Sequence, residues 1–308
     1  MVALELTSML VGRSHESASA AAVQELTLLG PQLAIPLLEY GLCVYHLFVE
    51  RLRELRPDVI LTCLQAAHGA VLQAELMQAA LEAALGYVPK VVHCAAQSLA
   101  GCWSDMQAIA DAVGQPGKGQ QLVTQLKQRF EAAATACKGR PPRRVACIQW
   151  PQPLYAAGSW VPEMIALTGS RDVCGRVEEA VVLSEEDLAR AEPDVVIFAL
   201  CGLTLRQSRR AAAGVARRMG GAGGLWGRLP AARRGRVAVV DGERVFSRPG
   251  PLLADSLEVL VEILQPEAQG YGHQGSLWEL LPAEAAQRQG DATGSDSEQG
   301  GVLELAPA

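Results

Sequence analysis

Three aromatic side chains follow one short apolar run in the middle of the chain. Residues 145–148 are apolar, and Trp150, Tyr155 and Trp160 come soon after them. Such a run is typical of a strand buried on both faces, and open parallel sheets bind ligands at the carboxyl ends of their strands. Flat rings at that edge would supply contact area to a broad, apolar ligand. The alternative is that the rings are ordinary packing, and composition alone does not separate the two.

The segment after this run has the features of a loop and then of a helix. Pro151 and Pro153 cannot continue a sheet ladder, so we expect the chain to leave the sheet at Trp150. Pro162 and Glu163 then occupy first-turn positions that suit proline and a carboxylate. The sequence therefore predicts a strand, an aromatic loop and a helix, in this order.

Other residues that carry chemistry fit weaker patterns. Cys201 stands at the end of a predicted strand, as a nucleophile would, but no histidine follows at a suitable spacing. His68 and His93 lie near predicted sheet edges, where a metal ligand or an axial ligand to cobalt would sit, although lone histidines there are more often structural. The glycine run 220–224 lacks the Lys-Ser/Thr pair of a phosphate loop. We expect no catalytic residue and no metal site built from side chains.

The composition excludes several classes of protein. The chain has 308 residues, 49% of them hydrophobic, which suffices for a large core divided between two lobes. No run approaches the roughly 20 apolar residues that a membrane-spanning helix needs. A net charge of -6 and a pI near 5.5 argue against nucleic acid as the main partner, although arginine is concentrated between Arg206 and Arg236.

The cysteines and the first residues bear on the compartment. The eight cysteines form no C-x-x-C pair and no zinc-type spacing, and several lie in apolar runs, so we expect buried thiols rather than disulfides. The first ten residues, MVALELTSML, lack the basic region, apolar core and cleavage site of a secretory signal. As written, the chain is therefore expected to be cytoplasmic.

Helices and strands alternate along both halves of the chain, which is typical of parallel sheets. We expect helices over residues 17–29, 44–55, 66–85, 98–113, 184–191 and 250–264, and strands over residues 57–62, 88–93, 145–148, 193–200 and 236–240. Residues 201–224 are expected to form a helix or an arginine- and glycine-rich loop. Between the two halves, an uninterrupted helix over residues 119–137 is long enough to bridge two lobes, or to serve as a plain crossover.

These elements divide the chain into four parts. Residues 1–116 form an N-terminal lobe, 117–138 a connecting helix and 139–266 a C-terminal lobe. Residues 267–308 have few apolar side chains and are expected to be a disordered tail, in which Trp278 and Leu280 dock only transiently.

Four motifs together resemble the periplasmic-binding-protein family for vitamin B12 and ferric siderophores. They are WPQPLYAAGSWVPEMIALTGSRDV, the pair LRPDVILT and AEPDVVIFALCGLTL, SLAGCWSDMQAIADAVG, and LPAARRGRVAVVDGERVFSRPGPLLADSLEVLVEIL. The resemblance spans about residues 10 to 266 and is greatest to members of the cobalamin-binding type. It implies an α/β fold of two Rossmann-like lobes with parallel sheets, joined by one long rigid helix, with the ligand in the cleft between them.

The resemblance also implies a set of ligand-binding residues. They are His15 and Glu16 in the first lobe, and Trp150, Tyr155, Trp160, Phe246, Ser247 and Arg248 in the second. In this set the rings give contact area, and Arg248 would meet an acidic or amide edge of the ligand.

Three departures from the family pattern concern the first lobe. The family's first strand and helix are missing before Met1, so the resemblance implies a truncated N-terminal lobe. The family's Cys and Asp-Tyr-Pro residues after His-Glu are replaced by Ser17 to Ala20, and the polar residues after PDVILT by Cys63 to His68.

The function implied is binding without catalysis and without a required cofactor. The expected ligand is a corrinoid, a ferric siderophore or a related metal complex, and an exported form would deliver it to an ABC transporter permease. We expect a monomer that neither binds nucleic acid nor spans a membrane. Two alternatives remain: a degenerate cytosolic interaction protein on the same fold, and an enzyme that uses Cys201 or His68 in the cleft.

Overall fold

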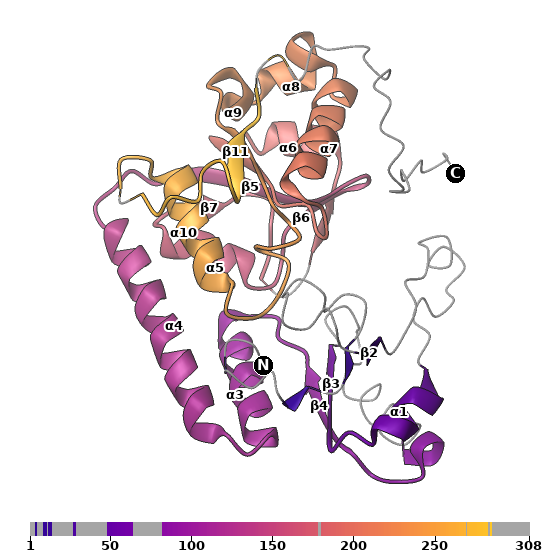
Figure 1. Ribbon diagram of the computed structural model, residues 1–308. Helices are drawn as coiled ribbons and strands as arrows, with labels where there is room; N and C mark the ends of the chain where they lie inside the picture. The colour runs from indigo at the N-terminus through magenta and orange to yellow at the C-terminus, as the bar shows by residue number, and fades with distance from the viewer. Residues whose placement is uncertain are drawn as a thin grey trace.

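The computed structural model has two α/β lobes joined by a long helix, α4 (Pro116–Ala136), as Figure 1 shows. It describes residues 4, 9–10, 12–13, 27–28, 48–63, 82–177, 180–268, 270–282 and 284. Within these residues, no helix is both long and apolar enough to cross a membrane.

The N-terminal lobe contains two parallel strands side by side, β3 (Val59–Cys63) and β4 (Lys90–Cys94). They pair in register over five positions, from Val59 opposite Lys90 to Cys63 opposite Cys94. Helix α1 (Val49–Leu55) precedes β3 and packs on it through the buried Leu52. A short parallel pair, β1 (Gly12–Arg13) and β2 (Thr27–Leu28), completes the described strands of this lobe. Both strands predicted for this half are confirmed, and most of the helix predicted over residues 66–85 lies outside the described residues. The helix predicted over residues 17–29 is wrong at its end, because residues 27–28 form β2.

Helices α3 (Leu99–Ala112) and α4 lie side by side, and α4 continues to the second lobe (Figure 1). The hydroxyl of Ser98 accepts the Gly101 N–H at 3.1 Å and so caps α3, which begins where the helix over residues 98–113 was predicted. Gly119 allows α4 to approach α3 closely, because a side chain there would collide with Ala110. The far end of α4 packs on α10 (Leu253–Leu264) of the C-terminal lobe. At 21 residues α4 is about 30 Å long, so the predicted bridging helix is confirmed.

The C-terminal lobe is built on a seven-stranded sheet in the order β11-β10-β9-β5-β6-β8, with β7 beside β5. Strands β10, β9, β5 and β7 are parallel, and β6, β8 and β11 pair antiparallel. The strands are β5 (Arg144–Pro151), β6 (Leu154–Ala156), β7 (Arg171–Asp172), β8 (Val181–Leu183), β9 (Val195–Phe198), β10 (Val237–Val240) and β11 (Trp278–Leu280).

Helices cover both faces of this sheet. Its central strands β9 and β10 are buried at every position, as the apolar runs predicted. One face packs against α3, α4, α10 and α5 (Val161–Leu167) in a single core cluster. The other face packs against α6 (Glu185–Arg190), α7 (Leu205–Arg218), α8 (Leu225–Arg228) and α9 (Pro230–Arg233). The 3-10 turn η6 (Gly221–Gly223) connects α7 to α8.

The chain does not leave the sheet at Trp150, so that prediction was wrong. Strand β5 continues to Pro151, and the chain then turns back as β6, with Trp150 opposite Tyr155 and Pro151 opposite Leu154. Proline is tolerated because it ends the strand, where its missing N–H removes no bond from the interior of the ladder. The aromatic segment is therefore a hairpin attached to the sheet.

The prediction of a disordered tail was wrong for residues 270–282. Trp278 and its neighbours form β11, which pairs with β10, and the Trp278 side chain is buried. The buried carboxylate of Glu262 holds this segment on α10. Its Oε1 accepts the N–H groups of Tyr271, Gly272 and His273, and its Oε2 accepts Trp278 Nε1 at 2.6 Å. The local sequence did not indicate this order, because the partners of the segment, strand β10 and Glu262 of α10, lie elsewhere in the chain.

We expect Glu262→Gln to destabilise the protein by about 1.5 to 3 kcal/mol near neutral pH, because it weakens hydrogen bonds to a charged acceptor. Burial alone would raise the pKa of Glu262, but the bonds from Trp278 and the backbone outweigh it and hold the pKa below its ordinary value. The stability from this carboxylate is therefore present above the ordinary glutamate pKa and is lost as pH falls through the lowered one.

Urea unfolding of the parent and of Glu262→Gln, from neutral to acidic pH, measures this effect. The difference between their free energies of unfolding should shrink on acidification. A difference that stays constant down to about pH 3 would show that the charge of Glu262 contributes nothing.

Candidate functional site

Trp150 and Tyr155 lie next to each other at the carboxyl end of β5. They are opposite residues of the β5–β6 hairpin, which places their side chains on the same face of the sheet. Both are half-buried, and Trp150 Nε1 donates to the carbonyl of Gln152 at 3.1 Å, which fixes the indole in its own hairpin. The structure therefore brings together two of the predicted aromatic residues, with part of each side chain open to solvent.

Trp160 is placed differently, inside the core. Only 4% of its surface is exposed, and Nε1 donates to the carbonyl of Phe246 at 2.8 Å. Phe246 is also buried and belongs to the same core cluster. Trp160 joins the start of α5 to the loop after β10. It therefore holds the Phe246 loop in place from within the core, and its ring faces are not open to solvent.

Two hydrogen bonds fix the loop after β10 in a strained conformation. Phe246 has φ +71°, a left-handed conformation that side-chain-bearing residues seldom adopt. Its N–H donates to Ser256 Oγ at 3.0 Å, while its carbonyl accepts the bond from Trp160. Ser247 and Arg248 follow directly and are half-buried. The predicted residues of this loop are thus held at the carboxyl edge of the sheet by contacts with α5 and α10.

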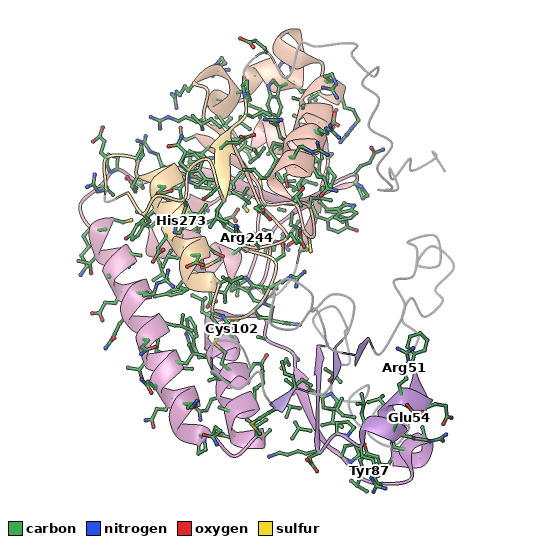
Figure 2. The ribbon with its side chains drawn as sticks, viewed as in Figure 1. Arg51, Glu54, Tyr87, Cys102, Arg244 and His273 are labelled. Atoms are coloured by element: carbon green, nitrogen blue, oxygen red, sulfur yellow. The ribbon has the colours of Figure 1, made fainter. Side chains whose placement is uncertain are left out.

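The strand between these two groups sets their separation. Strand β9 lies between β5 and β10, and adjacent strands are about 4.8 Å apart, so the hairpin and the Phe246 loop begin about 10 Å from each other. The loops after β9 and β10 pack closely, because a side chain at Gly242 would collide with the carbonyl of Leu200. Figure 2 shows the exposed Arg244, which lies on the loop after β10. This edge is broad, with aromatic groups on one side and hydroxyl and guanidinium groups on the other.

A carboxylate from the second lobe ties it to the first. Glu163 Oε2 on α5 accepts the N–H of Leu99, at the start of α3, with a length of 2.7 Å. In the loop before α3, the Ala96 N–H donates to Asp105 Oδ2 at 3.0 Å. Burial raises the pKa of Asp105, and the backbone bonds that it accepts oppose this shift. Sequence reasoning missed the contact of Glu163 with Leu99 because 64 residues separate the two.

These contacts predict that ligand binding changes the overall shape very little. The core cluster runs continuously from α3 through α4 and α5 to α10, and Glu163 bonds across the lobes. Small-angle scattering curves recorded with and without cyanocobalamin or hemin should nearly superimpose. Glu163→Ala should enlarge the difference, because it removes the bond to Leu99. A marked fall in the radius of gyration of the parent protein on binding would contradict this prediction.

The remaining predicted residues are not assembled into a site by the described structure. His15, Glu16 and His68 lie outside the described residues. His93 Nδ1 shares a hydrogen bond with Thr62 Oγ1 at 2.7 Å. Cys201 is exposed, and neither described histidine, His93 or His273, is bonded to it. Cys102, Cys137 and Cys147 are buried free thiols, as expected.

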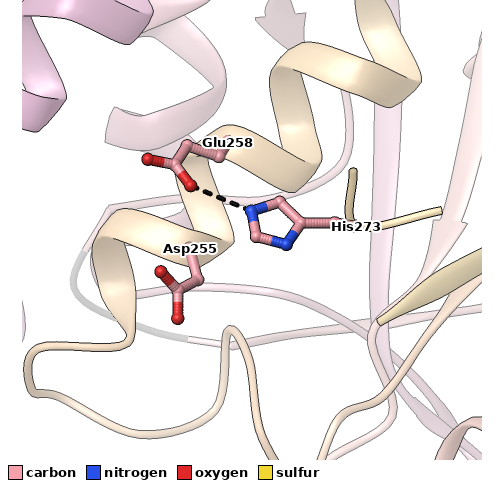
Figure 3. A group of neighbouring side chains, drawn as sticks. All are labelled: Asp255, Glu258 and His273. Atoms are coloured by element: carbon pink, nitrogen blue, oxygen red, sulfur yellow. Dashed lines mark hydrogen bonds and ion pairs between the residues drawn. The ribbon is translucent and has the colours of Figure 1, made fainter. Parts of the chain in front are cut away.

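One cluster offers three metal-ligand atoms within 4.8 Å of one another: Asp255, Glu258 and His273, drawn in Figure 3. Glu258 Oε2 is hydrogen-bonded to His273 Nε2 at 2.9 Å. Arg129 of α4 already pairs with both carboxylates, at 2.6 Å to Asp255 and 2.7 Å to Glu258. Because the guanidinium compensates the charge that would attract a cation, this cluster is explained as an ion-pair network that joins α4, α10 and the segment before β11.

A separate hollow of about 420 Å³ lies between the amino end of β5 and strand β8, and neither Trp150 nor Tyr155 lines it. Arg144, Arg171 and Arg176 line it together with Asp172 and Cys174. Burial, followed by the charge of Asp172, raises the pKa of the Cys174 thiol to about 12, so the thiol is neutral and unreactive at ordinary pH. Since open sheets bind ligands at the carboxyl ends of their strands, this hollow is not the predicted site.

Comparison with known proteins identifies the family. A family model described as periplasmic binding protein matches residues 6–243, well over half of the chain. The chain therefore belongs to the periplasmic binding protein family, and the α/β fold predicted from the sequence motifs is confirmed. Among proteins of curated function, none matches the chain.

Several solved structures share the fold. A periplasmic heme-binding protein from Pseudomonas aeruginosa is 23% identical with a TM-score of 0.67, over 91% of this chain and 93% of that one. The periplasmic vitamin B12-binding protein BtuF of Vibrio cholerae is 19% identical with a TM-score of 0.61, over 86% and 91%. The periplasmic heme-binding protein RhuT from Roseiflexus sp. RS-1, in apo form, is 20% identical with a TM-score of 0.61, over 85% and 92%.

Proposed function

We propose that this protein binds a corrinoid, a heme or a ferric siderophore without catalysis. The ligand lies at the carboxyl edge of the C-terminal sheet, between the Trp150–Tyr155 hairpin and the loop of Phe246, Ser247 and Arg248. The observation that carries this proposal is the half-buried aromatic pair at that edge, opposite a loop fixed by buried hydrogen bonds. His15 and Glu16 are proposed to complete the site from the first lobe.

The chemistry of this edge fits a flat macrocycle or chelate with polar margins. Two adjacent rings on one face give apolar contact area, and Ser247 and Arg248 give hydrogen-bond donors for carboxylate or amide groups. The structures of similar fold include proteins described as binding heme and vitamin B12, which supports this class of ligand. In this proposal Trp160 acts by holding the Phe246 loop in place.

Family membership supports a role as the substrate-binding component of an ABC transporter. The protein would then hand its ligand to a membrane permease from the outer side, in an exported form. The domains proposed from the sequence suit this role, because a long helix joins two lobes that share one core. Proteins of this kind release their ligand unchanged, so we propose no enzymatic step, and no required cofactor, for this chain.

Calorimetric titration with cyanocobalamin, hemin and a ferric siderophore tests the proposal. We expect saturable binding of at least one of the three. Binding of none would overturn it and leave an interaction protein that keeps the fold without a ligand.

A further inference from the structure

The C-terminal lobe carries a run of chain with arginines and no acidic residue. Between Asp194 and Asp241 there are nine arginines, no lysine, no aspartate and no glutamate. This stretch contributes +9 to the net charge of the chain, which is -6, so the remaining residues together carry -15. The charge of the molecule is therefore strongly polarised, and the proposed ligand site does not account for it.

The fold collects these arginines on one layer of helices. Helices α7, α8 and α9 cover one face of the C-terminal sheet and lie together at the top of Figure 1. The apolar side chains of this layer face the sheet. Its exposed arginines are Arg206, Arg209, Arg210, Arg217, Arg218, Arg228, Arg233 and Arg234, which we call the arginine face.

The arginine face contains a straight row on α7. Arg206, Arg210 and Arg217 are spaced by four and seven residues, so they lie on one side of the helix over about 16 Å. The opposite side of α7 packs into the core through Ala212, Val215 and other small residues. A row of this kind presents several guanidinium groups to one extended partner.

Acidic side chains neutralise part of the arginine face. Arg209 pairs with Glu279 at 3.3 Å, Arg218 with Glu185 at 3.4 Å and Arg234 with Asp194 at 2.8 Å. Arg206 and Arg210, the first two arginines of the row, have no ion pair within the described part of the chain. Two adjacent arginines without an acidic partner are suited to an anionic partner.

We propose that the arginine face docks on the phosphate groups of an anionic phospholipid surface. Guanidinium groups bind phosphate oxygens in pairs of hydrogen bonds, which explains arginine without lysine. Single-stranded nucleic acid is less suited, because the two aromatic residues of this stretch, Phe198 and Trp226, are buried and unavailable for stacking on bases. The choice of a membrane rests on the proposed function, which places the protein beside a membrane transporter.

Vesicle sedimentation tests this docking. The full chain, without ligand, is mixed either with vesicles of phosphatidylcholine alone or with vesicles that also contain phosphatidylglycerol. We expect binding to the anionic vesicles only, and a strong decrease in high salt. Arg206→Ala/Arg210→Ala should weaken binding about 25-fold, at about fivefold for each arginine removed. The control, Lys127→Ala/Lys138→Ala, removes the same charge from exposed positions on and just after α4 and should change binding much less.

The proposal would be overturned if the protein bound neutral vesicles as tightly as anionic ones, or if the two double variants lost the same amount of affinity for anionic vesicles. Tighter binding to duplex DNA or to polyglutamate than to anionic vesicles, at the same ionic strength, would also overturn it. Circular dichroism of both variants confirms that they are folded. Neither variant should alter titration with hemin or cyanocobalamin. A failure of docking and a failure of ligand binding are therefore seen in separate experiments.

Discussion

Trp160→Ala is expected to lower the free energy of unfolding by about 3 to 5 kcal/mol, since it removes a large buried side chain and leaves a cavity. The indole lies in the core cluster that joins α5 to α3, α4 and α10. It also supplies the hydrogen bond that holds the Phe246 carbonyl. Thermal and urea unfolding measure the loss.

Trp160→Phe is the matched control for this substitution. It keeps most of the apolar volume but leaves the buried carbonyl of Phe246 without its donor, which costs about 1 to 3 kcal/mol. We therefore expect Trp160→Phe to lie between the parent and Trp160→Ala in stability. Two variants as stable as the parent would show that Trp160 is not a core residue in solution.

Trp150→Ala/Tyr155→Ala is expected to weaken binding of cyanocobalamin or hemin by about a hundredfold, if each ring contributes about 1 to 2 kcal/mol of contact. Because both residues are half-buried at the end of a hairpin, their removal should cost less stability than Trp160→Ala. Calorimetric titration and thermal unfolding of the same variant separate the two effects.

Tyr87→Ala provides the control for loss of a half-buried aromatic residue. Figure 2 shows Tyr87 at the end of the first lobe far from the C-terminal sheet. The Tyr87 hydroxyl donates to the Pro57 carbonyl, and its ring lies beside Arg56. Tyr87→Ala should leave ligand affinity unchanged. A similar loss of affinity in this control would show that the effect of the site variant comes from general destabilisation.

Features that depend on local sequence were predictable. Helices α3 and α6 begin within one residue of the predicted positions, where Ser98 and Ser184 cap them, and the absence of a helix breaker after Gly119 indicated the long helix α4. Buried parallel strands β9 and β10 followed from their apolar runs. In each case the signal and the structure involve residues within a few positions of one another.

Features that depend on distant partners were not predictable from the pattern. Proline at the end of β5 indicated a loop, but pairing with β6 keeps the hairpin on the sheet. The aromatic character of Trp160 suggested an exposed ring, yet its indole N–H finds the carbonyl of Phe246, 86 residues away, inside the core. The polar segment before β11 is held because three of its backbone N–H groups, together with the indole N–H of Trp278 in β11, donate to Glu262. The sequence indicates that aromatic residues lie near the end of β5, but not which of them are buried in the core and which are partly open to solvent.

A crystal structure of the protein with cyanocobalamin or hemin, whichever binds more tightly in titration, tests the central proposal most directly. We expect the macrocycle at the carboxyl edge of the C-terminal sheet, against Trp150 and Tyr155, with a carboxylate or amide of the ligand near Ser247 or Arg248. Trp160 should remain buried and bonded to Phe246. A macrocycle in the hollow at the amino end of β5, or anywhere out of contact with Trp150 and Tyr155, would contradict the proposed site.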